Sequence, residues 1–190
     1  MKIPQIELFM AAKVIDIKTY IPKSQDIFFF DNNIWMYLFC PLGNYNKSHQ
    51  KQYSIFLQCV RTSHSTVFIN SMVLSEFANR YLRMDFEQWK KDPGNYYAEF
   101  KKDYVGSLRY ISIIDEIKIQ INQIMKFCEK TSDNFNAIDL KNVFNHFRQI
   151  DFNDSYYIEL AKLSKWKIVT DDQDFIRYTG HDLEVITYLN

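Results

Sequence analysis

The sequence predicts an α/β fold in which a central parallel sheet lies between two layers of helices. Short, unbroken apolar runs bounded by turn-forming residues are typical of strands that are buried on both faces. Segments with helical spacing alternate with these runs, and this alternation favours parallel strands joined by right-handed helical connections. The first such run is Ile27-Phe28-Phe29-Phe30, which leads directly into Asp31.

The size of the chain limits the number of its domains, and its net charge argues against a strongly basic nucleic-acid-binding protein. Its 190 residues are enough for one domain, or for one domain with a large insertion. Hydrophobic residues make up 47%, so a full core is available, and the formal net charge is zero. A polyanion would therefore have to be bound by a local or metal-assisted site, because there is no overall basic field.

The cysteines and the N-terminal stretch indicate a cytoplasmic protein. The cysteines are odd in number and far apart, which is more typical of small buried hydrophobic residues than of disulfides or a zinc site: Cys40, Cys59 and Cys128. Lys13, Asp16 and Lys18 interrupt the apolar character of the N-terminal stretch, which argues against a signal peptide. No later stretch is apolar enough to span a membrane.

The elements of the first half can be placed in order. Residues 1–25 are ambiguous, and 6–17 could form a short helix or a strand. A strand over 27–31 is followed by a helix over 34–39, for which Asn32 or Asn33 can serve as the N-cap. The pattern then predicts a helix over 48–61, a strand over 66–70 and a helix over 72–83 that Ser71 caps.

The second half contains a long helical region before the α/β pattern returns. Residues 84–148 are interpreted as a helical insertion or arm on a single domain spanning 1–190, with a turn at 92–95 and helices over 108–130 and 139–149. A helix over 156–164 and a strand over 166–170 follow. Asp171 to Phe175 opens a short helix to Tyr178, Gly180 ends it, and a last strand covers 183–187.

Acidic residues recur where these strands end. Asp31, Asp171 and Asp172 follow strands, Glu76 lies one turn into a helix that follows a strand, and Asp154 opens a helix. Each one alone is more simply explained as a cap, a turn residue or a solvated side chain. Together they would lie at one edge of the sheet, where they would repel one another unless a cation neutralised them. Mg²⁺ or Mn²⁺ suits such an all-oxygen site.

The same residues resemble the PIN-domain ribonuclease family, which includes VapC-type toxins. Phe30-Asp31-Asn32-Asn33 resembles the family's opening aspartate, followed after one residue by a small polar residue. Leu74-Ser75-Glu76-Phe77 resembles its helix glutamate. The block around Asp154, followed by Val169-Thr170-Asp171-Asp172-Gln173-Asp174-Phe175, resembles its closing pair of aspartates, with Asp171 as the free position.

The resemblance implies a three-layer α/β/α PIN-like domain and a set of site residues. The catalytic, metal-binding acids would be Asp31, Glu76, Asp154 and Asp172. Asn33 would orient Asp31 or a bound water, and Asp174 would be a secondary acid or a cap. The implied activity is a metal-dependent endoribonuclease that hydrolyses RNA with Mg²⁺ or Mn²⁺. The implied partners are the RNA substrate, an antitoxin protein and a second copy in a homodimer.

Basic and aromatic residues interleave between Arg80 and Tyr110. The candidate substrate-binding cations are Arg80, Arg83, Lys90 and Lys91, because bases of single-stranded RNA can stack on aromatic rings while cations contact phosphates. Packing of these rings on the core or on a partner is at least as good an interpretation.

Two other functions fit the sequence less well than the nuclease does. The first is a non-catalytic PIN-fold module that binds RNA or protein, which the full set of acids disfavours. The second is a haloacid-dehalogenase-type phosphatase, which needs a second aspartate where this chain has Asn33. The scattered histidines are assigned no catalytic role.

Overall fold

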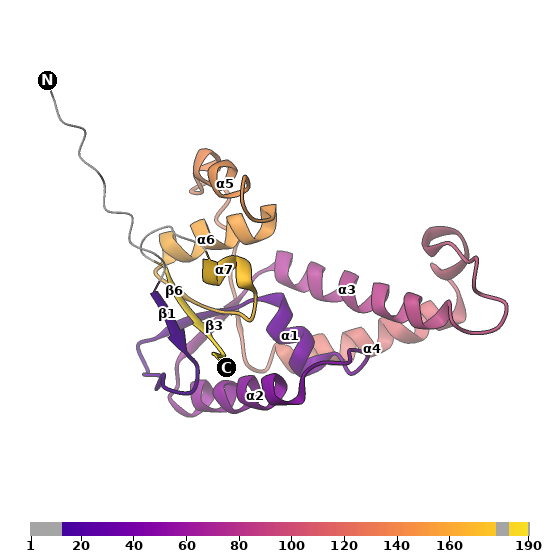
Figure 1. Cartoon of the computed structure of the whole chain (residues 1–190), viewed down its shortest axis with the longest axis horizontal. Coiled ribbons are helices and arrows are strands. Elements are labelled where there is room, and N and C mark those ends of the chain that lie inside the picture. The colour runs from indigo at the N-terminus through magenta and orange to yellow at the C-terminus, as the bar shows by residue number, and fades with distance from the viewer. Residues whose placement is uncertain (1–12, 178–182, 190) are drawn as a thin grey trace, which may run out of the picture.

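The computed structural model, which describes residues 13–177 and 183–189, contains a six-stranded sheet whose pairs are all parallel (Figure 1). The strand order is β1-β6-β5-β2-β3-β4. The strands are β1 (Lys13–Asp16), β2 (Ile27–Phe30), β3 (Thr66–Ile69), β4 (Glu129–Lys130), β5 (Lys167–Val169) and β6 (Glu184–Thr187). The predicted parallel α/β architecture is confirmed.

Helices cover both faces of the sheet, as the side chains of the central strand β2 show. Successive side chains of a strand point to opposite faces. Phe28 and Phe30 contact Phe56 of α2 (Lys47–Thr62), and Phe30 also contacts Trp35 of α1 (Asn32–Phe39). Phe29 packs instead on Tyr157 of α6 (Phe152–Ser164). All three phenylalanines are buried, which explains why the strand is apolar throughout.

The N-terminal ends of three helices differ from the prediction. α1 begins at Asn32 and its N-cap is Asp31, not Asn32 or Asn33. α3 (Ser71–Trp89) is capped by Asn70, not Ser71, and is longer than predicted. α6 is capped by Asp151, whose side chain accepts a hydrogen bond from the Asp154 N–H, so Asp154 lies in its first turn. In each case more than one residue near the start of the helix is a good cap, and the sequence does not choose between them.

The segment after α3 forms an arm that extends from the sheet (Figure 1). It contains the predicted turn, where Gly94 has a φ of 92°, then the π-helix η1 (Phe100–Tyr104) and α4 (Leu108–Ile124), which returns along α3. The prediction of one helix over 108–130 is wrong at its end. Glu129–Lys130 is strand β4, which pairs with β3 at the edge of the sheet.

The remaining elements follow the predicted order. α5 (Leu140–His146) packs on α6, and α7 (Gln173–Arg177) follows β5. Tyr178, Gly180 and the first twelve residues lie outside the described residues, so the ambiguous N-terminal segment is settled only for β1. Cys40 is buried as predicted, but Cys59 is exposed, which contradicts the prediction for that residue. No helix within 13–177 and 183–189 is long and apolar enough to cross a membrane.

Candidate functional site

A cavity of about 790 Å³ lies at the carboxyl end of the strands, and all four predicted acids line it. Asp31 ends β2, Glu76 lies on α3, Asp154 lies on α6 and Asp172 follows β5. The lining also includes Asp151, Asn32, Asn33, Arg80 and Arg83. Ligands of parallel α/β sheets bind at this edge because the strand ends and the helix starts meet there.

Asp31 is buried and held by two hydrogen bonds. Its Oδ1 accepts the backbone N–H of Asn32 at 2.5 Å, and its Oδ2 accepts the Thr170 hydroxyl at 2.8 Å. Burial raises the pKa of Asp31 to about 7, because a desolvated carboxylate is costly. The charges of Glu76 and Asp172 raise it further, while the two hydrogen bonds oppose the change.

Asp154 has no compensating contact. Asp154 is buried, with only 8% of its surface exposed, yet no residue that the structure describes donates a hydrogen bond to its carboxylate. Burial, followed by the charges of nearby acids with Asp31 first, raises the pKa of Asp154 to about 9. Without a bound cation, this carboxyl group would therefore carry a proton at neutral pH.

Glu76 is oriented by residues of the opposite helix. Asn153 donates to its Oε1, and the Tyr157 hydroxyl donates to its Oε2 at 3.1 Å. Burial nevertheless raises the pKa of Glu76. Asn153 and Tyr157 belong to α6, so the packing of α6 against α3 fixes the direction of this glutamate.

Thr170 connects the predicted residues of β2 and β5 but was not predicted as a site residue. Its buried hydroxyl donates to Asp31 and accepts from Asn33 Nδ2 and from the backbone N–H of Asp172, both at 3.0 Å. Asn33 therefore acts on Asp31 through Thr170, although it also lines the cavity. The feature of the sequence that could have identified Thr170 is its place in the Val169-Thr170 block, directly before the closing aspartates.

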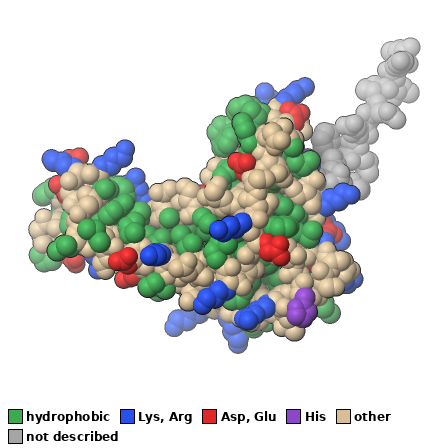
Figure 2. Space-filling model, turned by 180° about the vertical axis from the view of Figure 1, so that it is seen from behind, with side chains coloured by type: hydrophobic (Ala, Val, Ile, Leu, Met, Phe, Trp, Pro, Cys, Tyr) green, Lys and Arg blue, Asp and Glu red, His purple; other side chains and the backbone are tan. Residues whose placement is uncertain are grey.

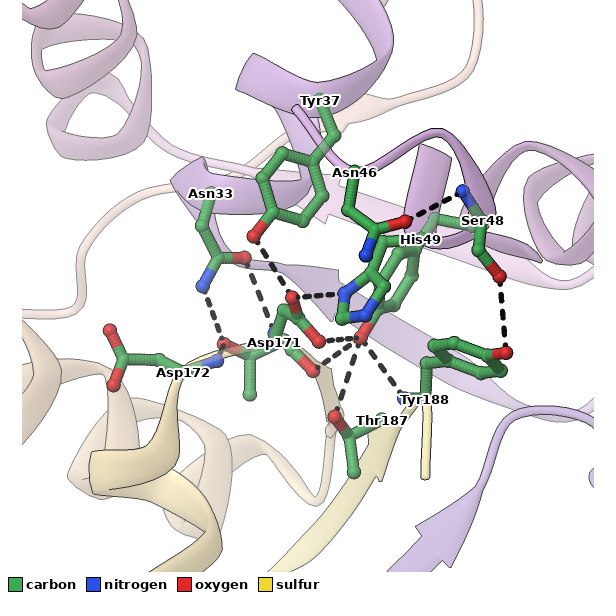
Figure 3. Close-up of polar contacts among 11 residues, drawn as sticks. Asn33, Tyr37, Asn46, Ser48, His49, Asp171, Asp172, Thr187 and Tyr188 are labelled. Atoms are coloured by element: carbon green, nitrogen blue, oxygen red, sulfur yellow. Dashed lines mark hydrogen bonds and ion pairs between the residues drawn. The ribbon is translucent and has the colours of Figure 1, made fainter. Parts of the chain in front are cut away.

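Asp171 does not line the cavity, and Figure 3 shows its side chain turned toward Tyr37 and His49, away from the side chain of Asp172. Asp171 Oδ2 accepts the Tyr37 hydroxyl at 2.9 Å and contacts His49 Nδ1 at 2.7 Å, and its Oδ1 accepts the Tyr53 hydroxyl at 3.0 Å. These contacts hold the loop after β5 from the side of α1 and α2, while Asp172 faces the cavity. His49, for which the sequence predicts no catalytic role, is one of the residues that hold this loop.

The four candidate cations lie in two separate hollows, and Asp174 lies at the start of α7. Asp174 lies in the first turn of α7, where its backbone N–H donates to Asp172 Oδ1 at 2.9 Å. Arg80 and Arg83 line the cavity with the acids. Lys90 and Lys91 line a separate hollow of about 580 Å³ at the far end of α3.

The chemistry of the cavity fits a divalent cation, although the side chains are not arranged as a closed site. Among the residues that the structure describes, no three His, Cys, Asp or Glu side chains lie close enough together to hold a metal ion. Direct contact of three of these side chains with one ion would require the acids to move closer together, whereas Mg²⁺ often keeps several waters and binds only one or two carboxylates. The donors are carboxylate oxygens, which Mg²⁺ and Mn²⁺ prefer. The Oδ1 atom of Asn32, next to Asp31, is also buried and has no hydrogen-bond partner among the described residues.

Comparison with known proteins shows the family of the chain and a similar fold. The family model of the PIN domain matches residues 28–180. The fold is similar to that of a chain in the crystal structure of VapBC2 from Rickettsia felis bound to a DNA fragment from their promoter. That match has a TM-score of 0.51 and 15% identity, and covers 86% of this chain and 99% of the other, so it concerns the fold. A search of curated protein sequences found no match.

Proposed function

Because this chain belongs to the PIN domain family, we propose that it is an endoribonuclease that hydrolyses RNA with the help of Mg²⁺ or Mn²⁺. The observation that carries the proposal is the cavity itself, in which acids from four separate elements meet. Burial and mutual repulsion raise the pKa values of Asp31 and Asp154, so the acids are arranged at a cost to the free protein. Such a cost is typical of functional sites.

In this proposal the residues of the cavity have three roles, which are to bind the ion, to orient its ligands and to attract the RNA. Asp31, Glu76, Asp154 and Asp172 would hold the ion, which supplies an activated water and neutralises charge on the phosphate. Thr170 and Asn33 orient Asp31, while Asn153 and Tyr157 orient Glu76. Arg80 and Arg83 would attract the RNA phosphates to the cavity that they line.

The structural match supports a further step in the proposal. The similar chain comes from a VapBC2 complex, and VapC-type proteins are toxins that pair with antitoxins. We therefore propose an antitoxin as protein partner and a homodimer as the assembly. Co-expression with the product of a neighbouring gene, followed by size-exclusion chromatography, would test both.

The first experiment is cleavage of a mixed RNA panel by the wild type and by Asp31→Asn. Cleavage is expected for the wild type with Mn²⁺, and should be lost with EDTA. Asp31→Asn should lower the rate by about a thousandfold or more, because charge stabilisation by the ion is weakened. No cleavage in any condition, together with RNA binding without Mn²⁺ binding, would favour a non-catalytic PIN-fold binding module. The observation that favours such a binding module is that no three potential metal ligands lie close together among the described residues.

A further inference from the structure

One face of α3 runs from the acidic cavity to the arm. Glu76, Arg80, Arg83, Glu87 and Lys90 follow one another at spacings of three or four residues, so they lie along the same side of the helix. The stretch from Glu76 to Lys90 is about 20 Å long at the rise of an α-helix. Its near end lines the acidic cavity and its far end lines the second hollow.

Two arginines, Arg80 and Arg83, follow Glu76 on this face and line the cavity with it. Within 13–177 and 183–189, neither Arg80 nor Arg83 takes part in a salt bridge. The guanidinium of Arg83 lies over the ring of Phe100, 3.7 Å from its centroid, and this contact fixes the cation beside the cavity. A cation that is held in this way without a salt bridge, as Arg83 is among the described residues, is suited to a phosphate group that leads into the acidic site.

The far end of this face offers exposed aromatic rings. Tyr96 is 72% exposed and Tyr97 is 90% exposed, and their ring centroids are 4.9 Å apart in an edge-to-face arrangement. Both line the second hollow together with Lys90 and Lys91. Figure 2 shows basic and hydrophobic side chains next to each other at the end of the arm.

These tyrosines do not serve the packing of the arm. Phe100 and Tyr104 of the arm pack against each other and against Phe86 of α3, and Tyr104 is fully buried. Tyr96 and Tyr97 remain outside this cluster. The aromatic residues of this segment could serve packing or RNA binding. Packing explains the rings of Phe86, Phe100 and Tyr104, but it does not explain Tyr96 and Tyr97.

The charges around the hollow indicate which part of a nucleic acid it fits. Glu87 and Glu99 line it beside the two lysines, so the charges of the hollow balance. A balanced hollow has little attraction for the phosphate backbone. Stacking of a base on an aromatic ring does not require net charge and tolerates any base.

We propose that α3 guides single-stranded RNA, with phosphates near Arg80 and Arg83 and a base stacked on Tyr96 or Tyr97. The cavity end of this path rests on the proposed nuclease function, whereas the tyrosine end does not. The strand must be single because bases in a duplex are already stacked and cannot reach a protein ring. The site would select long substrates over short ones, since only a strand of several nucleotides spans both ends.

Binding can be measured without cleavage by working in EDTA. Fluorescence anisotropy would compare labelled single strands of about four and about twelve nucleotides with a duplex of the longer one. Tyr96→Ala/Tyr97→Ala should weaken binding of the longer strand about tenfold or more. Tyr96→Phe/Tyr97→Phe should retain the wild-type affinity, since phenylalanine still stacks. The matched control is Phe144→Ala/Phe147→Ala, which removes two exposed rings, one on α5 and one at its C-cap.

Cleavage with Mn²⁺ then separates this path from the nuclease proposal. The alanine pair should raise KM for the longer strand and leave kcat unchanged. Equal binding and equal KM for wild type and the alanine pair would overturn the path, whether or not RNA is cleaved, and would leave the tyrosines as a protein contact. Tyrosine-dependent binding of the duplex would overturn it as well. Tyrosine-dependent binding of the single strand without cleavage would support the path and contradict the nuclease function.

Discussion

The chain contains two kinds of buried carboxylate, and they differ in their partners. Asp85 on α3 accepts the Tyr104 hydroxyl at 2.7 Å and pairs with the Arg109 guanidinium. Glu159 on α6 contacts His146 at 2.7 Å and Lys162 at 2.8 Å. Asp31 has only neutral donors, and Asp154 has none among the described residues. Asp85 and Glu159 therefore join parts of the fold, whereas Asp31 and Asp154 have no cationic partner among the described residues and could bind a cationic ligand.

The pKa values express the same contrast. Burial would raise the pKa of Glu159, but hydrogen bonds from His146 and Lys162 outweigh burial and lower it to about 2. At Asp31 and Asp154 burial prevails, and the pKa rises to about 7 and about 9. Burial acts in the same direction on all three acids, and the net pKa shift differs because hydrogen bonds from His146 and Lys162 outweigh burial only at Glu159. The cavity acids cost stability in the free protein, which is the usual trade-off at a functional site.

Removal of Asp85 should have the largest effect on stability. Asp85→Ala leaves the Tyr104 hydroxyl and Arg109 without their shared partner inside the arm. We expect the free energy of unfolding to fall by about 3 kcal/mol, measured by urea denaturation. The control is Asp92→Ala at an exposed position, which should stay within about 0.5 kcal/mol of the wild type. A fall that is no larger for Asp85→Ala would remove the distinction between the two kinds of acid.

Glu159→Gln should have a smaller effect that depends on pH. The lowered pKa of Glu159 means that its ionised form stabilises the fold above its usual pKa of 4.5, and that this contribution is lost as the pH falls toward 2. We expect a loss of about 2 kcal/mol at neutral pH and a smaller loss in acid. An equal loss at both pH values would show that the charge of Glu159 has no part in its contribution.

Asp154→Asn should have the smallest effect and the opposite sign. The raised pKa means that free wild type loses stability as the pH rises from about 4 toward 9, since ionisation of a buried carboxyl group is unfavourable. The amide cannot ionise, so the variant should be about 1 kcal/mol more stable at neutral pH in EDTA. Thermal unfolding across this pH range would measure it. A variant that is less stable than wild type at all pH values would mean that Asp154 is a structural residue.

The fold could be predicted where one strand carries a strong local signal. The run before Asp31 is apolar because both faces of β2 are covered, and the acids at the strand ends mark the edge of the sheet. Strand β4 could not be predicted, since Glu129–Lys130 is short and exposed and is defined only by its pairing with β3. Its residues resemble the end of the preceding helix.

The direction of individual side chains was harder to predict than their position in the chain. Asp171 and Asp172 are neighbours after the same strand, yet Asp172 lines the cavity and Asp171 does not. The difference arises from Tyr37, His49 and Tyr53, which come from α1 and α2 more than a hundred residues earlier in the chain. No local pattern around Asp171 contains that information.

Calorimetric titration of Mn²⁺ into the wild type at pH 7 tests the central claim most directly. Buffers with different ionisation enthalpies would report the protons that leave when the metal binds. Because the pKa values of Asp31 and Asp154 are raised, we expect binding with release of about one proton or more per protein. Asp154→Asn should bind more weakly and release fewer protons. Absence of binding, or binding without proton release, would contradict the view that these buried carboxylates await a cation.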